Sequence, residues 1–184
     1  VWLKAHSVLG TPAVVGVGLR GAASTLFVLL LVSYGLKVLR YPRAVRMEMR
    51  HPVRIHFFPK VSISLLLLAI AYLESAPEAA FWLWIAGAAL HLSLTLAIFG
   101  SWIHHTHYAI QHANPAWFIP VVGNIIVPVA GVHLASPELS WFFFSIGLVF
   151  WIVLLTIVLY RLFFHEPLPA RLAQWDWSVS VAGM

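Results

Sequence analysis

The chain has 184 residues, of which 61% are hydrophobic and only 9% are charged. Because soluble domains carry about 25% charged residues, this composition excludes a polar surface in water and indicates a membrane protein. The formal net charge of +5 does not indicate nucleic-acid binding, since the basic residues gather in one short segment beside membrane-like sequence. The chain has no cysteine, which excludes disulfides and thiolate metal sites.

Five hydrophobic segments predict an all-α membrane protein, because each is close to the roughly 20 residues that a helix needs to cross a bilayer. We expect these spans at approximately 21–39, 55–73, 81–102, 116–134 and 141–164. Every connection between them is too short to fold separately, so residues 1–184 are predicted to form a single membrane domain.

The charges of the connections alternate along the chain. The segment 37–54 is strongly basic and contains one acid, Glu48, whereas the connections 74–78 and 135–138 carry acids and no base. Because basic loops stay on the cytoplasmic side, we expect the segment 37–54 and the tail after the fifth span to be cytoplasmic.

Several tryptophans lie near the predicted span ends, where amphipathic rings favour the membrane–water interface. They are Trp82, Trp84, Trp102, Trp117 and Trp141. This placement predicts an aromatic belt.

Prolines distinguish the second and fourth spans from the other three. Pro59 lies near the beginning of the second span, and Pro120 and Pro128 lie within the fourth. A proline removes a helical hydrogen bond and bends the helix, and the freed carbonyls need partners in protein or water. Gly123 and Asn124 add a flexible point and an amide between the two prolines. Broken helices form the substrate pathway of several transporters, although membrane helices also tolerate such residues as packing kinks.

The predicted spans contain almost no carboxylates. This argues against cation binding at mid-membrane and leaves no paired acids for acid–base catalysis, so we expect neither catalytic residues nor enzyme activity. Arg54 and Lys60 stand at the entry to the second span. Their charges could draw anions to a pore mouth, or could extend to lipid headgroups.

The histidines between 104 and 112 suggest an alternative, a membrane haem or metal protein. Their spacing provides no i, i+4 pair on a helix, and no carboxylate is close in sequence. His91 is expected near mid-membrane and His133 near the outer end of its span, so the two cannot readily face one haem. Solvated loop histidines are the favoured interpretation, with no metal ligand and no cofactor.

Two stretches resemble a known family. They are His51–Phe58 (HPVRIHFF) and Ala113–Asn124 (ANPAWFIPVVGN), and Glu166–Leu172 (EPLPARL) is a weaker match. Their order and spacing are similar to those of the tellurite-resistance/dicarboxylate transporter family. This family includes TehA-like permeases, yeast malate and sulfite transporters, and the slow anion channels of plant guard cells.

The resemblance implies a fold of ten helices in five hairpins, assembled as a homotrimer, with the odd-numbered helices around a pore in each subunit. The five spans match helices two to six, so the second and fourth spans become pore-lining. The chain begins where the first helix should end and stops matching after Leu172. We therefore expect about half of a pore, without the family's pore-occluding phenylalanine, and a non-conducting fragment stays an open alternative.

On this basis we predict a channel or permease for small anions of the halide, nitrate, sulfite, tellurite or C4-dicarboxylate class. A proton-coupled carrier for dicarboxylates or oxyanions is the alternative. The expected partners are the lipid bilayer, small anions and further copies of the chain, with no nucleic acid, and the expected location is a bacterial inner membrane. The predicted pathway residues are Phe57, Phe58, Pro59, Pro120, Gly123, Asn124 and Pro128, with Arg54 and Lys60 at the mouth.

Overall fold

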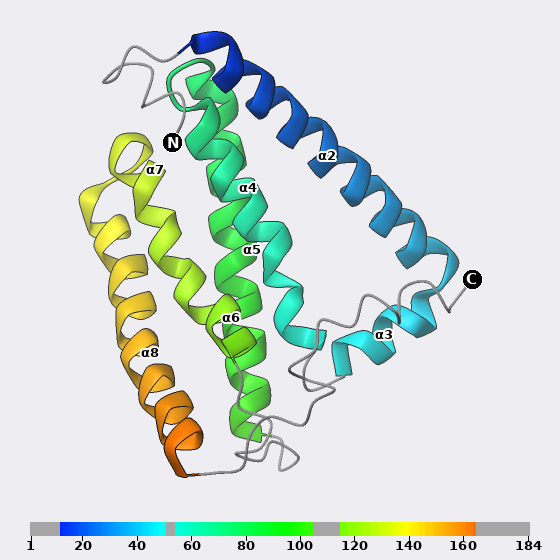
Figure 1. Ribbon diagram of the computed structural model, residues 1–184, viewed down its shortest axis with the longest axis vertical. Coiled ribbons are helices and arrows are strands. Elements are labelled where there is room, and N and C mark those ends of the chain that lie inside the picture. Colours follow the sequence, from blue (N-terminus) through cyan, green and yellow to red (C-terminus); the bar gives the residue numbers. More distant parts are fainter. Residues whose placement is uncertain (1–11, 51–53, 105–114, 165–184) are drawn as a thin grey trace.

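The computed structural model describes residues 12–50, 54–104 and 115–164, whose regular structure is entirely helical (Figure 1). The prediction of five membrane-spanning helices is confirmed. The largest difference lies in the first span, where the helix begins at Ala13 rather than near Gly21. The helical stretches long and apolar enough to cross a membrane are Val14–Arg40, Arg54–Tyr72, Pro77–His104, Pro115–Leu134 and Pro137–Phe164.

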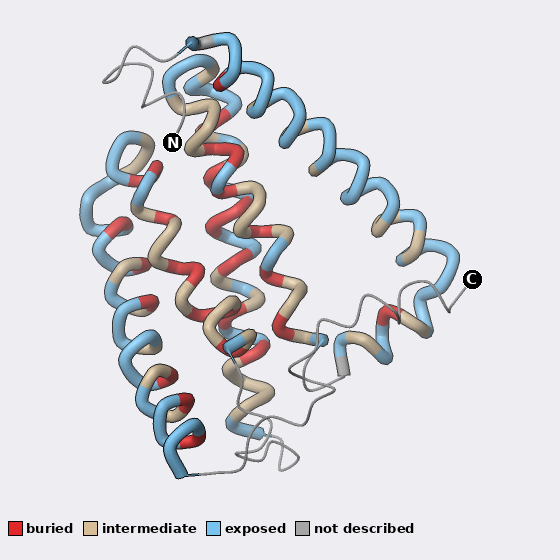
Figure 2. Tube along the Cα trace, in the orientation of Figure 1, coloured by how far each residue is buried: buried red, intermediate tan, exposed pale blue. Residues whose placement is uncertain are grey.

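Helix α2 (Ala13–Arg40) diverges from the other spans and is almost entirely exposed (Figures 1 and 2). Near its beginning, the Arg20 guanidinium lies 4.9 Å from the centre of the Tyr72 ring and donates to the Ala71 carbonyl. The Ser24 and Tyr72 hydroxyls are 2.9 Å apart. Polar contacts therefore fix this end of α2 to the end of the second span, while its apolar middle stays uncovered.

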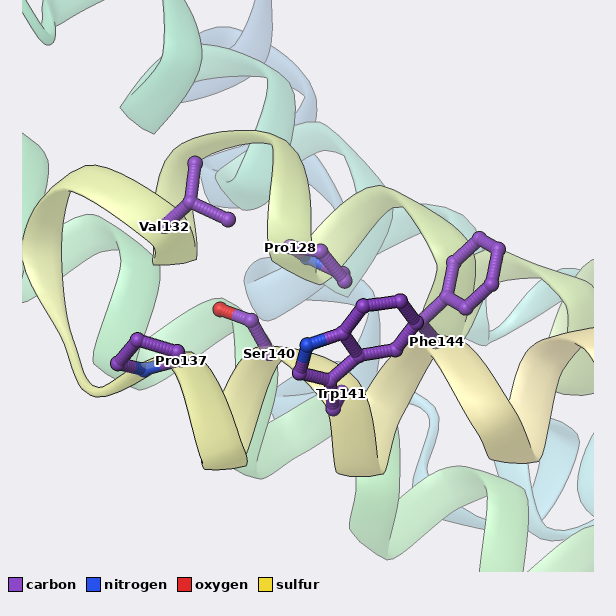
Figure 3. A pocket seen from close by; sticks show the side chains of 6 residues that line it. All are labelled: Pro128, Val132, Pro137, Ser140, Trp141 and Phe144. Atoms are coloured by element: carbon purple, nitrogen blue, oxygen red, sulfur yellow. The ribbon is translucent and has the colours of Figure 1, made fainter.

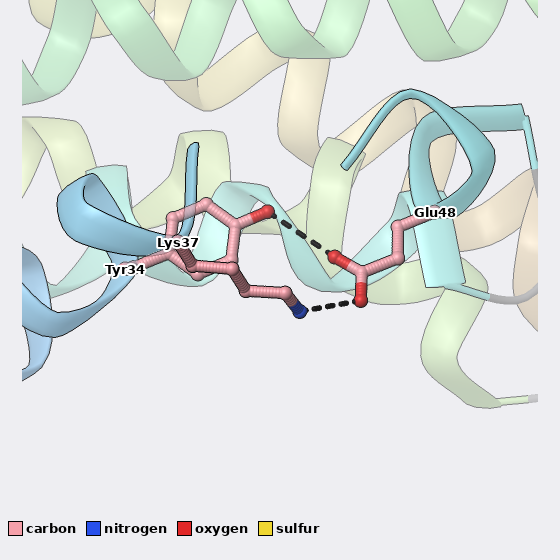
Figure 4. Close-up of polar contacts among 3 residues, drawn as sticks. All are labelled: Tyr34, Lys37 and Glu48. Atoms are coloured by element: carbon pink, nitrogen blue, oxygen red, sulfur yellow. Dashed lines mark hydrogen bonds and ion pairs between the residues drawn. The ribbon is translucent and has the colours of Figure 1, made fainter. Parts of the chain in front are cut away.

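The basic segment after α2 is a helix rather than the loop that we expected. Helix α3 (Pro42–Arg50) begins at a proline, which is favourable in the first turn because its missing N–H has no helical partner there. Val45 is buried, while Arg43 is exposed. The Lys37 ammonium lies 2.6 Å from Glu48 Oε1, and the Tyr34 hydroxyl donates to the other carboxylate oxygen (Figure 4). These contacts join α3 to the end of α2.

The second span begins with the 3₁₀ turn η1 (Arg54–Phe57) and continues as helix α4 (Pro59–Tyr72). We expected Pro59 to bend the second span. This prediction is wrong, because Pro59 is the first residue of α4 and does not interrupt a helix. A proline in the first turn removes no helical hydrogen bond. Helix α5 (Pro77–His104) returns alongside α4. The two pack closely at Gly87, where a Cβ would lie 3.0 Å from Leu66 Cγ.

The fourth span is broken, as the prolines predict. It consists of η3 (Pro115–Trp117), α6 (Phe118–Val122), η4 (Gly123–Ile126) and α7 (Val127–Leu134). Figure 1 shows the resulting bend beside the continuous helix α8 (Pro137–Phe164). Gly147 of α8 brings the two elements together, because a Cβ there would lie 2.9 Å from the backbone nitrogen of Ile125.

Most of the buried residues lie where α4, α5, the broken span and α8 face one another (Figure 2). The main apolar cluster is Leu66, Ala69, Trp84, Ala88, Val127, Ala130 and Phe143. The tryptophan belt is therefore wrong in part. Trp84 and Trp117 are buried and Trp102 is half-buried, while Trp82 and Trp141 are exposed as a belt requires.

Candidate functional site

One face of α5 carries polar and aromatic side chains into the interior. Trp84, His91, Thr95 and Trp102 occupy positions i, i+7, i+11 and i+18, which fall on one face of an α-helix. Each of the four forms a hydrogen bond with the second or the fourth span. We call this set the α5 ladder.

The centre of the ladder is His91, which is completely buried. Its Nδ1 lies 2.8 Å from the Ser62 hydroxyl of α4, and that hydroxyl lies 2.7 Å from the Pro59 carbonyl. A serine hydroxyl has only one hydrogen, so when Ser62 donates it to the carbonyl, Nδ1 of His91 is the protonated nitrogen. Nε2 is then an acceptor, and it has no hydrogen-bond partner. It lies against Gly123, where a Cβ would be only 2.5 Å away.

Thr95 lies one turn further along α5 and contacts the break in the fourth span. Its hydroxyl is within hydrogen-bonding distance of the carbonyls of His91 and Pro120. The Asn124 amide donates to Thr95 Oγ1 at 3.1 Å and to the Val121 carbonyl at 2.9 Å. Side chains therefore donate hydrogen bonds to the carbonyls of Pro120 and Val121, close to the point where α6 ends and η4 begins. Asn124 Oδ1 is buried without a partner.

The two outer members of the ladder, Trp102 and Trp84, also contact the predicted pore spans. Trp102 Nε1 donates to Nε2 of the buried His56 at 3.1 Å. The Trp102 ring also stacks on Trp117 of η3 with 5.2 Å between ring centres. At the other end of α5, Trp84 Nε1 donates to the Val127 carbonyl, where α7 begins.

Four of the predicted pathway residues come together around the ladder. Pro59, Pro120, Gly123 and Asn124 are all buried, next to His91 or Thr95 or bonded to their partners. Their position in a pore lining stays a prediction. Within the described residues they hold the backbone of the two spans against α5.

The remaining predicted residues lie apart from this cluster. Phe57 and Phe58 are half-buried, and Phe58 meets the edge of Tyr34 with 6.2 Å between ring centres. Arg54 and Lys60 are exposed, as residues at a mouth would be, and Lys60 Nζ lies 4.2 Å from the centre of the Phe57 ring.

Pro128 contributes to a groove of about 250 Å³ between α7 and the start of α8 (Figure 3). No charged residue lines this groove, so its lining provides no means of selecting anions. The lining residues are Pro128, Val132, Pro137, Ser140, Trp141 and Phe144.

Among residues 12–50, 54–104 and 115–164, no three side chains of the metal-binding types form a group. His104 is exposed, with Nδ1 2.8 Å from the Gly100 carbonyl. The rest of the 104–112 histidine cluster lies outside the described residues.

Sequence reasoning considered His91 only as a haem ligand, and it missed Ser62, Thr95 and the pairing of His56 with Trp102. A signal was available in the helical spacing of Trp84, His91, Thr95 and Trp102 within an otherwise apolar span. Partners on other helices are tertiary contacts that such spacing does not identify.

Comparison with known proteins supports the resemblance stated above. The family model described as voltage-dependent anion channel matches residues 2–179. The S-type anion channel SLAH2 of Arabidopsis thaliana is 35% identical over 146 residues, covering 77% of this chain and 28% of the plant protein.

Two relatives of lower sequence identity come from prokaryotes. An uncharacterized transporter of Methanocaldococcus jannaschii is 28% identical, covering 83% of this chain and 48% of the relative. A TehA homolog of Haemophilus influenzae, named as a tellurite resistance protein, is 24% identical, covering 88% of this chain and 49% of the relative. The chain thus spans about half the length of these two relatives. It belongs to the voltage-dependent anion channel family, in agreement with the resemblance that its motifs had indicated.

Proposed function

We propose that this protein conducts small anions across a membrane, with the spans Arg54–Tyr72 and Pro115–Leu134 beside the pathway. The observation that carries the proposal is the break in the fourth span, whose irregular backbone is kept at membrane depth by the α5 ladder. Such backbone occurs in membranes where it is buried in protein or faces a water-filled path.

The distribution of charge favours anions over cations. In the described parts of the spans, the carboxylates Glu78 and Glu138 lie in first turns, and no acid lies further inside. The exposed cations Arg54 and Lys60 stand at the start of the second span. Relatives named as S-type anion channels and a tellurite resistance protein agree with this class of substrate.

Reconstitution of the full-length gene product in liposomes tests the proposal. A chloride or nitrate gradient should produce a membrane potential of the sign expected for anion permeability, and protein-free liposomes serve as the control. Cation-selective current without anion permeability would contradict the proposal.

The finer parts of the proposal follow the family. The substrates would be halide, nitrate, sulfite, tellurite or C4-dicarboxylate, and the assembly a homotrimer in a bacterial inner membrane with α3 on the cytoplasmic side. Phe57, Phe58, Pro59, Pro120, Gly123, Asn124 and Pro128 would shape or line the path, with Arg54 and Lys60 at its mouth.

A proton-coupled carrier is the second candidate, and the observation that favours it is His91. This titratable side chain is buried at mid-span, and Nε2 has no hydrogen-bond partner. A carrier of this kind would accumulate a dicarboxylate in liposomes when only a pH gradient is applied. A channel would respond to membrane potential without such accumulation.

A further inference from the structure

We infer that α5 sets the spacing between the two predicted pore spans, and that His91 is its central positioning residue. The consequence for anion selectivity rests on the proposed function, whereas the geometric inference does not. His91 lies between the two spans, because Nδ1 contacts Ser62 of α4 while Nε2 lies against Gly123 of η4.

The imidazole ring has little freedom to move away from η4. It is completely buried, and its contact with Ser62 fixes the ring on the α4 side. A methyl group at Gly123 would lie 2.5 Å from both Cε1 and Nε2 of the ring. Distances below about 3 Å are far inside ordinary van der Waals contact, so one of the two groups must shift.

Element η4 is also confined on its other side by α8. A Cβ at Gly147 would lie 2.5 Å from Ile125 Cγ1 and 2.9 Å from the Ile125 backbone nitrogen. The short helix is therefore packed between the His91 ring and the α8 backbone. A change in volume at His91 or Gly123 must move η4 relative to α4 or push apart the helices around it.

This arrangement links a residue outside the predicted pore to the width of the pore. Where selectivity comes from pore dimensions, a small displacement of a lining helix changes the relative permeability of anions of different size. His91 would thus act through η4 and α4 without contacting the permeating ion.

The experiment compares Gly123→Ala, His91→Ala and the double variant, with Gly100→Ala as the matched control. Gly100 lies on α5, and among the described residues no atom beyond its chain neighbours and the backbone of its own helix lies within 4 Å of a Cβ built there. Nitroxide labels on the exposed residues Leu67 of α4 and Val129 of α7 report the distance between the two spans by pulsed EPR. In the full-length protein, the nitrate-to-chloride permeability ratio reports selectivity, and loss of folded protein alone would not change this ratio.

We expect Gly123→Ala to shift both the label distance and the permeability ratio. Removal of the imidazole ring in the double variant should return the label distance and the permeability ratio toward the wild-type values. Gly100→Ala should change neither quantity. The inference would be overturned if Gly123→Ala left the label distance and the permeability ratio unchanged. It would also be overturned if adding His91→Ala to Gly123→Ala did not reverse the shift. If Gly123→Ala alone is not recovered from membranes, recovery of the double variant with the wild-type label distance supports the inference, and its loss contradicts it. Wild-type protein without anion permeability would refute the proposed function and leave the distance measurement valid.

Discussion

At the scale of single residues, Thr95 shows how a broken membrane helix can be stable. Its hydroxyl is buried between the Pro120 carbonyl and the Asn124 amide. Thr95→Val keeps the shape of the side chain and removes one hydrogen-bond partner from each of these groups, so we expect a loss of about 1–3 kcal/mol of stability. A lower thermal unfolding midpoint in detergent would show it. The control is Thr25→Val, since Thr25 is exposed and its hydroxyl donates to the Gly21 carbonyl of the same helix.

The ion pair between Lys37 and Glu48 makes a second prediction at this scale, concerning pH. The Lys37 hydrogen bond holds the pKa of Glu48 below its ordinary value of 4.5. A carboxyl with a lowered pKa stabilises the fold above its ordinary pKa, and this contribution is lost as the pH falls through the lowered value. A nitroxide at Met47 should therefore become more mobile below about pH 4.5, as α3 separates from α2. In Glu48→Gln the label should be mobile at every pH, and a label that is immobile throughout would count against the contact.

At the scale of elements, close packing of η4 on α8 depends on Gly147. Gly147→Ala would place a Cβ against the backbone of Ile125, and overpacking of this kind costs about 1–3 kcal/mol. Gly35→Ala, on the exposed helix α2 with open space around it, should instead stabilise by about 0.5–1 kcal/mol. Denaturation of both variants in the same detergent measures the difference. Equal changes in the free energy of unfolding for the two variants would mean that α8 and η4 can separate without loss of stability.

The elements also show what the sequence could predict. Long apolar runs and internal prolines predicted the five spans and the break near Gly123, because both features act within one helix. Pro59 was assigned a bend because its distance from the true helix start was unknown. Helix α3 was missed because a segment of nine residues with four charges between two apolar spans resembles a loop. The ladder partners Ser62 and Asn124 are tertiary contacts, and no local pattern encodes them. Trp84 was assigned to a lipid belt for the same reason.

At the scale of the whole molecule, the number of spans determines which connections share a side of the membrane. Helix α3 precedes the second span, and the connection at Ser136 precedes the fifth, so three crossings separate them. An odd number of crossings places the two on opposite sides. The excess of basic residues around α3 then predicts that this side is cytoplasmic.

Cysteine labelling in intact cells tests this arrangement, and the 184-residue chain has no cysteine of its own to interfere. Met47 and Ser136 are both exposed, so Met47→Cys and Ser136→Cys should react equally with a small maleimide in detergent. In intact cells, a membrane-impermeant maleimide should block Ser136→Cys and leave Met47→Cys unreacted until the membrane is opened. The reverse pattern would invert the topology and place Arg54 and Lys60 at an outer mouth. Equal blocking of both positions would contradict the odd number of crossings between them.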